Sequence, residues 1–442
     1  MNRKFCAIFT ALLCALLMTA QTFAAVPSTY SETYVVMDAT TGQVLLEKGA
    51  HKRMYPASIT KILTAAIALR DGDPKDKWTM SYKATHTIEA GSTHIALTEG
   101  ETVSVESLLY TMMIESANDS ANGLAEYIAG DIDDFPAVMN ETAASIGAVD
   151  SHFCNANGLS DPNHYTTAYD MALITKWALT IPGFREVFGA EEYTLPPDNK
   201  KTESFTYGTH NHMLVDSKYY YEGTEGGKLG WTEEAQHTLV ELVKRGDMEL
   251  IVVVMKSQTQ FLKYQDVIAL CDYCFENFGV STFSGALFEH DPIPVLRDGR
   301  EVATVTLATD DIAVNRPSTI AKADITCLVD VPEAYQAGEL IAPQALFTSP
   351  QGELIATVPI AYTYTETAGA AAAAPAQQPQ AGAAGRGSVL RVLKWIGIAL
   401  LILLALFVIV VFGVRAYNLR RRRRRRAARE AARAAAQKRR PE

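Results

Sequence analysis

The segment Pro56-Ala57-Ser58-Ile59-Thr60-Lys61 places a hydroxyl and an amine at helical spacing. The apolar rhythm that follows, over residues 62–69, predicts a helix that begins here, so Ser58 and Lys61 would share one face. A serine hydroxyl is a poor nucleophile without an adjacent base, and a desolvated lysine with a lowered pKa can be that base. The pattern alone is weak, because Ser-x-x-Lys also arises by chance as a helix cap with an exposed lysine.

Two further segments carry polar groups that can face a cleft. Ser116-Ala117-Asn118 interrupts two apolar helical stretches and offers a hydroxyl and an amide, although an ordinary capped turn between helices is the alternative. Gly226-Gly227-Lys228-Leu229-Gly230-Trp231-Thr232 places a cation among glycines at the start of a predicted strand. Glycine lets a substrate backbone lie close, whereas a hairpin turn with a solvated lysine is the alternative.

Histidine and cysteine spacing gives no metal signal. His210-x-His212 lacks a third ligand at suitable spacing, and Cys271-x-x-Cys274 lacks a second pair, so we expect no metal and no cofactor. Four cysteines remain once a predicted signal segment is removed, namely Cys154, Cys271, Cys274 and Cys327. Both disulfides and small buried thiols are compatible with this number.

The elements that must position these residues form a mixed pattern. Residues 34–37 and 44–46 predict a first hairpin, residues 238–243 and 250–254 a late one, and residues 58–70, 104–115 and 118–129 predict helices between them. Early and late strands with helices between them favour one sheet whose first and last strands are adjacent, with a helical lobe beside it. Residues 283–365 are rich in β-branched residues and predict a small β-sandwich-like domain.

The two ends of the chain predict export and anchoring. Residues 1–24 are typical of a cleaved signal peptide. Residues 366–394 form an Ala/Pro/Gln/Gly linker, residues 395–414 are an uncharged stretch long enough to cross a bilayer, and residues 415–442 are strongly basic. Because basic residues mark the cytoplasmic side, we expect a single-pass cell-membrane protein with its body, including a main domain at 25–282, outside the cytoplasm.

The formal net charge of −10 is a sum over these compartments. Residues 415–442 carry +11, and residues 25–385 carry 22 basic and 48 acidic groups, which is −26. Such an acidic body argues against nucleic-acid binding, since a phosphate backbone requires a positive surface.

Taken in order, Ser58-x-x-Lys61, Ser116-x-Asn118 and Lys228-x-Gly230 are far more specific than any one of them. Over about residues 30–365 the chain resembles the low-molecular-mass penicillin-binding proteins, the serine D-alanyl-D-alanine carboxypeptidases. Asn157-Gly158-Leu159 and Tyr165-Thr166-Thr167-Ala168 extend the resemblance. It implies an α+β fold with a β-lactamase/transpeptidase-like domain, in which an antiparallel sheet is joined by a helical lobe.

The resemblance also implies roles. Ser58 would be acylated by the terminal D-Ala-D-Ala of a peptidoglycan stem peptide or by a β-lactam, Lys61 would take its proton, and Ser116 and Asn118 would relay and position. The backbone N–H groups of Ser58 and Trp231 would form the oxyanion hole. The remaining substrate-binding residues implied are Lys228, Gly230, Thr232 and Lys263.

The sequence departs from the family pattern at the carboxylate subsite. Leu229 replaces a hydroxyl residue, for which Thr232 or the backbone could substitute, and Lys263 stands where an arginine is expected, which loses bidentate geometry. These changes keep open a wall-binding or regulatory protein with weakened turnover. A β-lactamase is a third hypothesis, against which the absence of an assignable deacylation segment, the β-rich domain and the span all speak.

Overall fold

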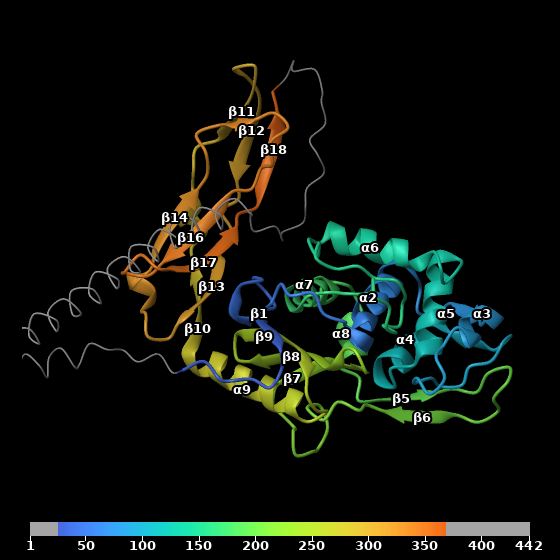
Figure 1. Cartoon of the computed structure of the whole chain (residues 1–442). Helices are drawn as coiled ribbons and strands as arrows, with labels where there is room; N and C mark the ends of the chain where they lie inside the picture. The colour runs from blue at the N-terminus through green and yellow to red at the C-terminus, as the bar shows by residue number, and fades with distance from the viewer. Residues whose placement is uncertain (1–24, 368–442) are drawn as a thin grey trace, which may run out of the picture. The chain divides into compact units, whose positions relative to one another are not determined.

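A computed structural model describes residues 25–367 of the chain, and its centre is a five-stranded antiparallel sheet (Figure 1). The strand order is β2-β1-β9-β8-β7, so the first strand lies inside the sheet between β2 and β9, and β7 forms an edge. The strands are β1 (Thr33–Asp38), β2 (Val44–Lys48), β7 (Thr224–Thr232), β8 (Gln236–Arg245) and β9 (Met248–Ser257).

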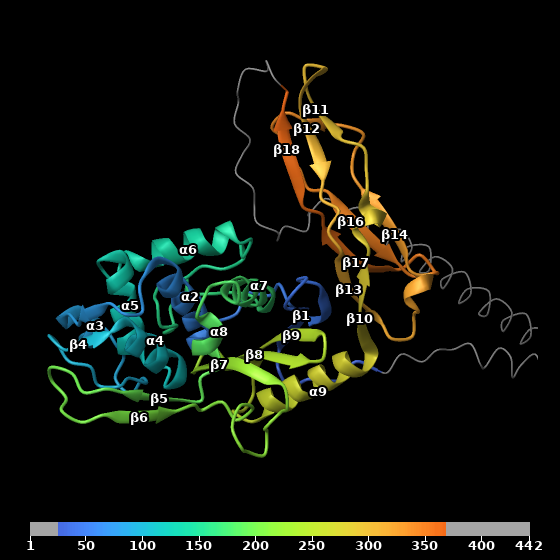
Figure 2. The same cartoon turned by 180° about the vertical axis from the view of Figure 1, so that it is seen from behind.

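Both faces of this sheet are covered, and the sequences of its strands reflect this. β9 is a nearly continuous apolar run, and all but one of its residues are buried. On one face Val240, Ile251 and Val253 pack into a core with the helical lobe. On the other face Leu239, Val252 and Val254 pack against α9 (Leu262–Asn277). Figures 1 and 2 show α9 and the helical lobe on opposite sides of the sheet.

The helical lobe lies between β2 and β7 in the sequence. α4 begins after Ser104, whose side chain accepts a hydrogen bond from the Ser107 N–H, and α7 begins after Thr167, which caps the Asp170 N–H in the same way. The helices are α2 (Lys61–Asp71), α3 (Tyr82–His86), α4 (Val105–Ile114), α5 (Asn118–Ala129), α6 (Phe135–Ser145), α7 (Ala168–Ala178) and α8 (Phe184–Phe188). Two short hairpins pair β3 (Lys77–Thr79) with β4 (Thr102–Ser104) and β5 (Glu192–Leu195) with β6 (Phe205–Gly208).

The predicted strand arrangement is confirmed. β1 pairs with β2 and also with β9, where Thr33 lies opposite Met255, and β8 and β9 form the expected hairpin. Two local predictions were imprecise. Ser58 lies in a short 3-10 turn, η1 (Ala57–Thr60), and the α-helix begins only at Lys61, while Lys228 lies in the middle of β7. Ala57, which directly precedes Ser58, has a φ of +52°, so no regular α-helix runs through it.

The residues after α9 are mostly strands around a separate apolar cluster that contains Phe288, Val305 and Phe347. The strands after α9 begin with β10 at Phe278, five residues before the predicted start of this region at residue 283. Its strands are β10 (Phe278–Phe283), β11 (Ile293–Arg297), β12 (Arg300–Leu307), β13 (Ile312–Pro317), β14 (Thr326–Asp330), β15 (Tyr335–Gln336), β16 (Gln344–Thr348), β17 (Leu354–Pro359) and β18 (Tyr362–Glu366). Two 3-10 turns, η2 (Gly285–Phe288) and η3 (Lys322–Asp324), complete it.

Within residues 25–367 no helix is both long and apolar enough to cross a membrane. The predicted signal peptide, most of the linker, the span at 395–414 and the basic tail lie outside the described residues. All four cysteines in the described part carry free thiols, and Cys271 and Cys274 are buried in α9.

Candidate active site

Ser58 and Lys61 are in direct contact. The Lys61 Nζ lies 3.0 Å from the Ser58 Oγ, and the amine also donates to the Asn118 Oδ1 at 2.7 Å and to the Asn157 carbonyl oxygen at 2.5 Å. Lys61 is fully buried at the first turn of α2, and Asn118 is the first residue of α5. The two oxygen acceptors fix the amine beside the hydroxyl, which is the arrangement that a nucleophile and its base require.

Burial lowers the pKa of Lys61 well below its ordinary value, and the nearby charge of Lys228 lowers it further, against a smaller opposing effect of Asp119. A lowered pKa increases the share of the neutral amine, and only the neutral amine can accept a proton from Ser58. The chemistry predicted from the Ser-x-x-Lys spacing therefore has both its geometry and its electrostatics in the structure.

The turn that carries Ser58 is held against two glycines. A Cβ at Gly158 would lie 2.0 Å from the Ala57 carbonyl oxygen, and one at Gly230 would lie 2.9 Å from the Ser58 nitrogen. From β8, the Thr238 hydroxyl donates a hydrogen bond of 2.9 Å to the Pro56 carbonyl oxygen, which also holds this turn against the sheet. The backbone N–H of Ser58 thus lies next to the edge strand β7, close to where the N–H of Trp231 was predicted to complete an oxyanion hole.

Ser116 joins the second motif to the third. Its φ of +63° places it in the left-handed region between α4 and α5, and its Oγ accepts a hydrogen bond of 3.1 Å from the Lys228 Nζ. Strained backbone of this kind persists where the surrounding structure enforces it, which is often at functional sites. Lys228 is buried, also donates to the Leu229 carbonyl, and has a pKa lowered to about 7, first by burial and then by the charge of Lys263.

Lys263 lies in the first turn of α9 and is 5% exposed. Burial lowers its pKa to about 8, while Glu241 raises it. Its Nζ lies 5.2 Å from the centre of the Tyr264 ring, and among the described residues no carboxylate oxygen comes within salt-bridge distance of it. The charge of Lys263 lowers the pKa of Lys228, so the two cations belong to one region of the site.

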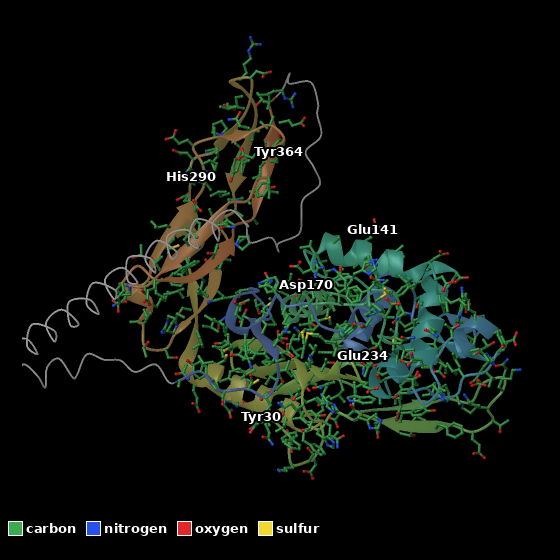
Figure 3. The ribbon with its side chains drawn as sticks, viewed as in Figure 1. Tyr30, Glu141, Asp170, Glu234, His290 and Tyr364 are labelled. Atoms are coloured by element: carbon green, nitrogen blue, oxygen red, sulfur yellow. The ribbon has the colours of Figure 1, made fainter. Side chains whose placement is uncertain are left out.

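The residues around Lys228 divide between the two faces of β7. Leu229 packs with the apolar cluster between the sheet and α9, and so fills the position of the expected hydroxyl with a hydrocarbon. The Thr232 hydroxyl accepts from the Ala235 N–H at 3.1 Å and lies 3.0 Å from Ser160, which also donates to Glu234, labelled in Figure 3. The Trp231 side chain is 61% exposed.

Sequence reasoning therefore found the side chains that meet, and missed three contributors. The Asn157 carbonyl was missed because a backbone acceptor has no residue signature, although the Asn-Gly pair at 157–158 signals a special turn. The close contact between Gly158 and the Ala57 carbonyl was missed for the same reason. The third is Glu241, which is buried in β8 behind the glycines that precede Lys228.

His210 and His212 do not form part of a metal centre in the described residues, where no group of three potential ligands is found. The His210 Nε2 lies 3.1 Å from a Glu115 carboxylate oxygen, and His212 packs among Tyr219, Phe261 and Tyr264.

A buried lysine on a serine nucleophile, next to the edge of an antiparallel sheet, defines the class of serine acyl-transfer enzymes that use lysine as the base. The family model described as D-alanyl-D-alanine carboxypeptidase matches residues 20–259, more than half of the chain, and the chain belongs to this family, peptidase family S11.

Individual relatives agree with this family. The chain is 32% identical over 248 residues to the D-alanyl-D-alanine carboxypeptidase DacF of Bacillus subtilis, covering 55% of this chain and 62% of that protein. For DacC of Escherichia coli the identity is 31% over 274 residues, covering 58% and 64%. These matches span just under two thirds of the relatives' length.

Among solved structures, penicillin binding protein 5 from Haemophilus influenzae matches with a TM-score of 0.63 and 25% identity, covering 78% of this chain and 99% of that one. The D-alanyl-D-alanine carboxypeptidase DacD from Francisella tularensis has a TM-score of 0.61 at 22% identity, covering 80% and 98%, and supports the fold alone.

Proposed function

We propose that this protein is a serine D-alanyl-D-alanine carboxypeptidase that removes the terminal D-Ala from peptidoglycan stem peptides and is acylated by β-lactams at the same serine. The single observation that carries the proposal is the fully buried Lys61 amine, held by Asn118 at 3.0 Å from the Ser58 hydroxyl. Family membership and the activities for which the relatives are named support the choice of substrate.

The geometry supports a two-step reaction. The Ser58 Oγ attacks the carbonyl carbon of the penultimate D-Ala, and its proton passes to the Lys61 amine while the backbone N–H groups of Ser58 and Trp231 stabilise the oxyanion. The C–N bond then breaks, and the leaving amine of D-Ala takes a proton through Lys61 and Ser116. Water hydrolyses the resulting ester, which releases the shortened peptide and restores the Ser58 hydroxyl.

The terminal carboxylate of the substrate requires positive charge, and the body of the protein carries −26. The cations Lys228 and Lys263 supply it locally, inside the site. Gly230 keeps β7 close to Ser58, and Thr232 lies at the end of the same strand.

We also propose the cellular setting that the chain ends predict. Residues 1–24 direct export, residues 395–414 span the cytoplasmic membrane once, and residues 415–442 stay in the cytoplasm. The linker at 366–394 and the β-sandwich-like domain at 283–365 would then set the distance between the active site and the membrane.

The second candidate is a penicillin-binding-fold protein with weakened turnover that binds or regulates the wall. Leu229 favours it, because its hydrocarbon side chain packs toward α9 where a hydroxyl would assist carboxylate binding. Slow release of a penicillin label without D-Ala release would support this candidate over the first.

One experiment tests the leading proposal. The full-length chain is incubated with a pentapeptide ending in D-Ala-D-Ala, and released D-Ala is measured; in parallel, mass spectrometry locates the adduct after penicillin treatment. We expect D-Ala release and an adduct on Ser58, both absent in Ser58→Ala. An intact Ser58 chain that releases no D-Ala would contradict carboxypeptidase activity, and an adduct elsewhere would contradict the nucleophile.

A further inference from the structure

The free edge of β7 has a direction, and its far end is not used by the proposed reaction. Side chains alternate along a strand, so Lys228, Gly230 and Thr232 share the face that borders the site. The Lys228 Nζ donates to Ser116 at 3.1 Å, and a Cβ at Gly230 would lie 2.9 Å from the Ser58 nitrogen. A peptide whose carboxylate lies at Lys228 and whose scissile carbonyl lies at Ser58 therefore continues past Thr232.

At this end of the strand, the loop that contacts the nucleophile turn returns to β7. Gly158 of this loop lies against the Ala57 carbonyl, and Ser160 follows two residues later. The Ser160 Oγ lies 3.0 Å from the Thr232 Oγ1 and donates a hydrogen bond of 2.6 Å to the Glu234 Oε2. So short a distance is typical of a hydroxyl that donates to an ionised carboxylate. Both the strand and the loop therefore position the Glu234 carboxylate, which is labelled in Figure 3.

Glu234 differs from the other surface acids in its position. Residues 25–385 carry 48 acidic groups, so negative charge alone marks no site on this protein. Glu234 is exposed, and among residues 25–367 no lysine, arginine or histidine lies within salt-bridge distance of its carboxylate. An exposed glutamate is ionised at neutral pH. It therefore presents an unbalanced negative charge at the point where a bound peptide leaves β7.

The proposed substrate offers one group of opposite charge at this point. Stem peptides are cross-linked through a side-chain amine of the residue that precedes D-Ala-D-Ala, so this residue is a diamino acid. Its amine stands at the end of a flexible hydrocarbon chain, as in lysine. Two residues of a strand span at most about 7 Å, so a side chain that begins beside Thr232 reaches the Glu234 carboxylate.

We propose that Glu234 is a specificity-determining residue, which binds the side-chain amine of the residue preceding D-Ala-D-Ala. This inference rests on the proposed carboxypeptidase function and names its substrate class more closely. A cross-linked amine has become an amide and carries no charge, so the enzyme prefers stem peptides whose amine is still free. It shortens the peptides that have not yet served as acceptors in a cross-link.

The test measures D-Ala release by the full-length chain from three peptides: Nα-acetyl-L-Lys-D-Ala-D-Ala, the same peptide acetylated on its side-chain amine, and the norleucine analogue, which lacks the amine. We expect kcat/KM at low salt to be about fivefold higher for the free amine than for either other peptide, the upper range for an exposed ion pair. The norleucine peptide separates the loss of charge from the bulk of the acetyl group. The preference should disappear in about 1 M salt, because screening weakens exposed charge pairs.

Glu234→Gln keeps an oxygen that can accept from Ser160 and removes only the charge. It should abolish the preference, while kcat/KM for the norleucine peptide stays within about twofold. Glu234→Lys should instead favour a peptide whose lysine is succinylated, because the two charges are exchanged. Glu233→Gln is the matched control, since it removes a neighbouring exposed acid of the same turn that is not the acceptor of the Ser160 hydrogen bond, and it should keep the preference.

Three outcomes would overturn the inference. One is an undiminished preference in Glu234→Gln, and another is equal kcat/KM for the three peptides in the parent. The third is an equal loss of preference in Glu234→Gln and Glu233→Gln, since that result marks a general effect of surface charge.

Failure of the proposed function is distinguishable from failure of this inference. Binding of the three peptides to a full-length Ser58→Ala chain, in which no ester forms at this position, can be followed by NMR titration of the peptide signals. Tighter binding of the free-amine peptide, lost when Glu234→Gln is added, would support the inference even if the parent releases no D-Ala from any peptide. Equal binding of all three peptides would contradict it.

Discussion

The carbonyl oxygen of Ala57 occupies the space that a side chain would fill at Gly158, since a Cβ there would lie 2.0 Å away. Both residues have a positive φ, +52° for Ala57 and +87° for Gly158. Ala57, a strained residue just before Ser58, is thus held in place by contact with Gly158 from a distant loop. The neighbour of this glycine, Asn157, also accepts a hydrogen bond from Lys61.

Gly158→Ala should therefore displace the nucleophile turn. We expect penicillin acylation to slow at least tenfold and the free energy of unfolding to fall by about 3 kcal/mol or more, because strain at positive φ is added to a backbone clash. Acylation kinetics and urea denaturation measure the two effects. Gly130→Ala is the control: its φ of +82° is similar, but nothing lies within 4 Å of the added Cβ, so it should lose only about 1 kcal/mol and no activity. Equal effects of both variants would show that the Ala57 contact is unimportant.

Leu229→Thr should restore a hydroxyl near the carboxylate subsite. We expect KM for the pentapeptide to fall about tenfold, the worth of one hydrogen bond to a carboxylate, at a cost of about 1 kcal/mol in stability from lost packing toward α9. Steady-state kinetics gives the answer, with Leu229→Val as a variant that loses packing without gaining a hydroxyl. A Val variant that improves KM as much as Thr would rule out the hydroxyl as the cause.

The acylation rate should depend on pH through Lys61. Because burial lowers the pKa of this amine, its neutral form persists to lower pH than that of an exposed lysine, and the rate should fall on acidification as the amine is protonated. Lys228→Met removes a cation that lowers this pKa, so the acidic limb should move to higher pH. Stopped-flow labelling by a fluorescent penicillin at a series of pH values measures the acidic limb of the pH–rate profile. Lys176→Met, which removes a half-buried lysine of α7, should leave it in place, and an unmoved limb in Lys228→Met would contradict the coupling.

His164 should make the protein sensitive to acid. Its Nδ1 accepts from the Cys154 N–H at 3.1 Å, so the ring is neutral with its proton on Nε2, 3.0 Å from the Thr60 Oγ1. Burial lowers the pKa of His164 from 6.5 to about 4. Between these values the unfolded chain binds more protons, so the free energy of unfolding should fall by about 3 kcal/mol as the pH drops from above 6.5 to 4.

Urea denaturation across this range tests the effect. His164→Gln should be less stable at pH 7 but lose less stability on acidification, while the contribution of His237, whose pKa is lowered in the same direction, stays. A variant with the same pH dependence as the parent would exclude His164 as the source.

The features that could be predicted from the sequence are those that depend on side-chain type and spacing. Hydrophobic periodicity located β1, β8 and β9 and their adjacency, and the ordered motifs located Ser58, Lys61 and Lys228, because side-chain types and spacing carry that information. The opposite directions of Lys228 and Leu229 also follow from the two-residue period of a strand.

The contributions that could not be predicted from the sequence depend on tertiary contacts. The acceptor at Asn157 is a main-chain oxygen, and the need for a glycine at 227 depends on which side chain of β8 lies opposite, here Glu241. Glu241 is an acid that strand alternation places among buried residues, where a solvated position would be the usual expectation. Only the fold shows that Asn211 lies beside it.

The pairing of Thr33 with Met255 also determines when the candidate active site can first form. The inner strand β1, made at the start of synthesis, has to wait for β9, and closing so long a loop is slow compared with forming local helices. Ser58 and Lys228 therefore meet only after nearly the whole of residues 33–257 has been made. A nascent chain interrupted before that point would hold every residue of the first two motifs without an assembled site. Under the proposed function, antibiotic binding would therefore report completed folding of the sheet.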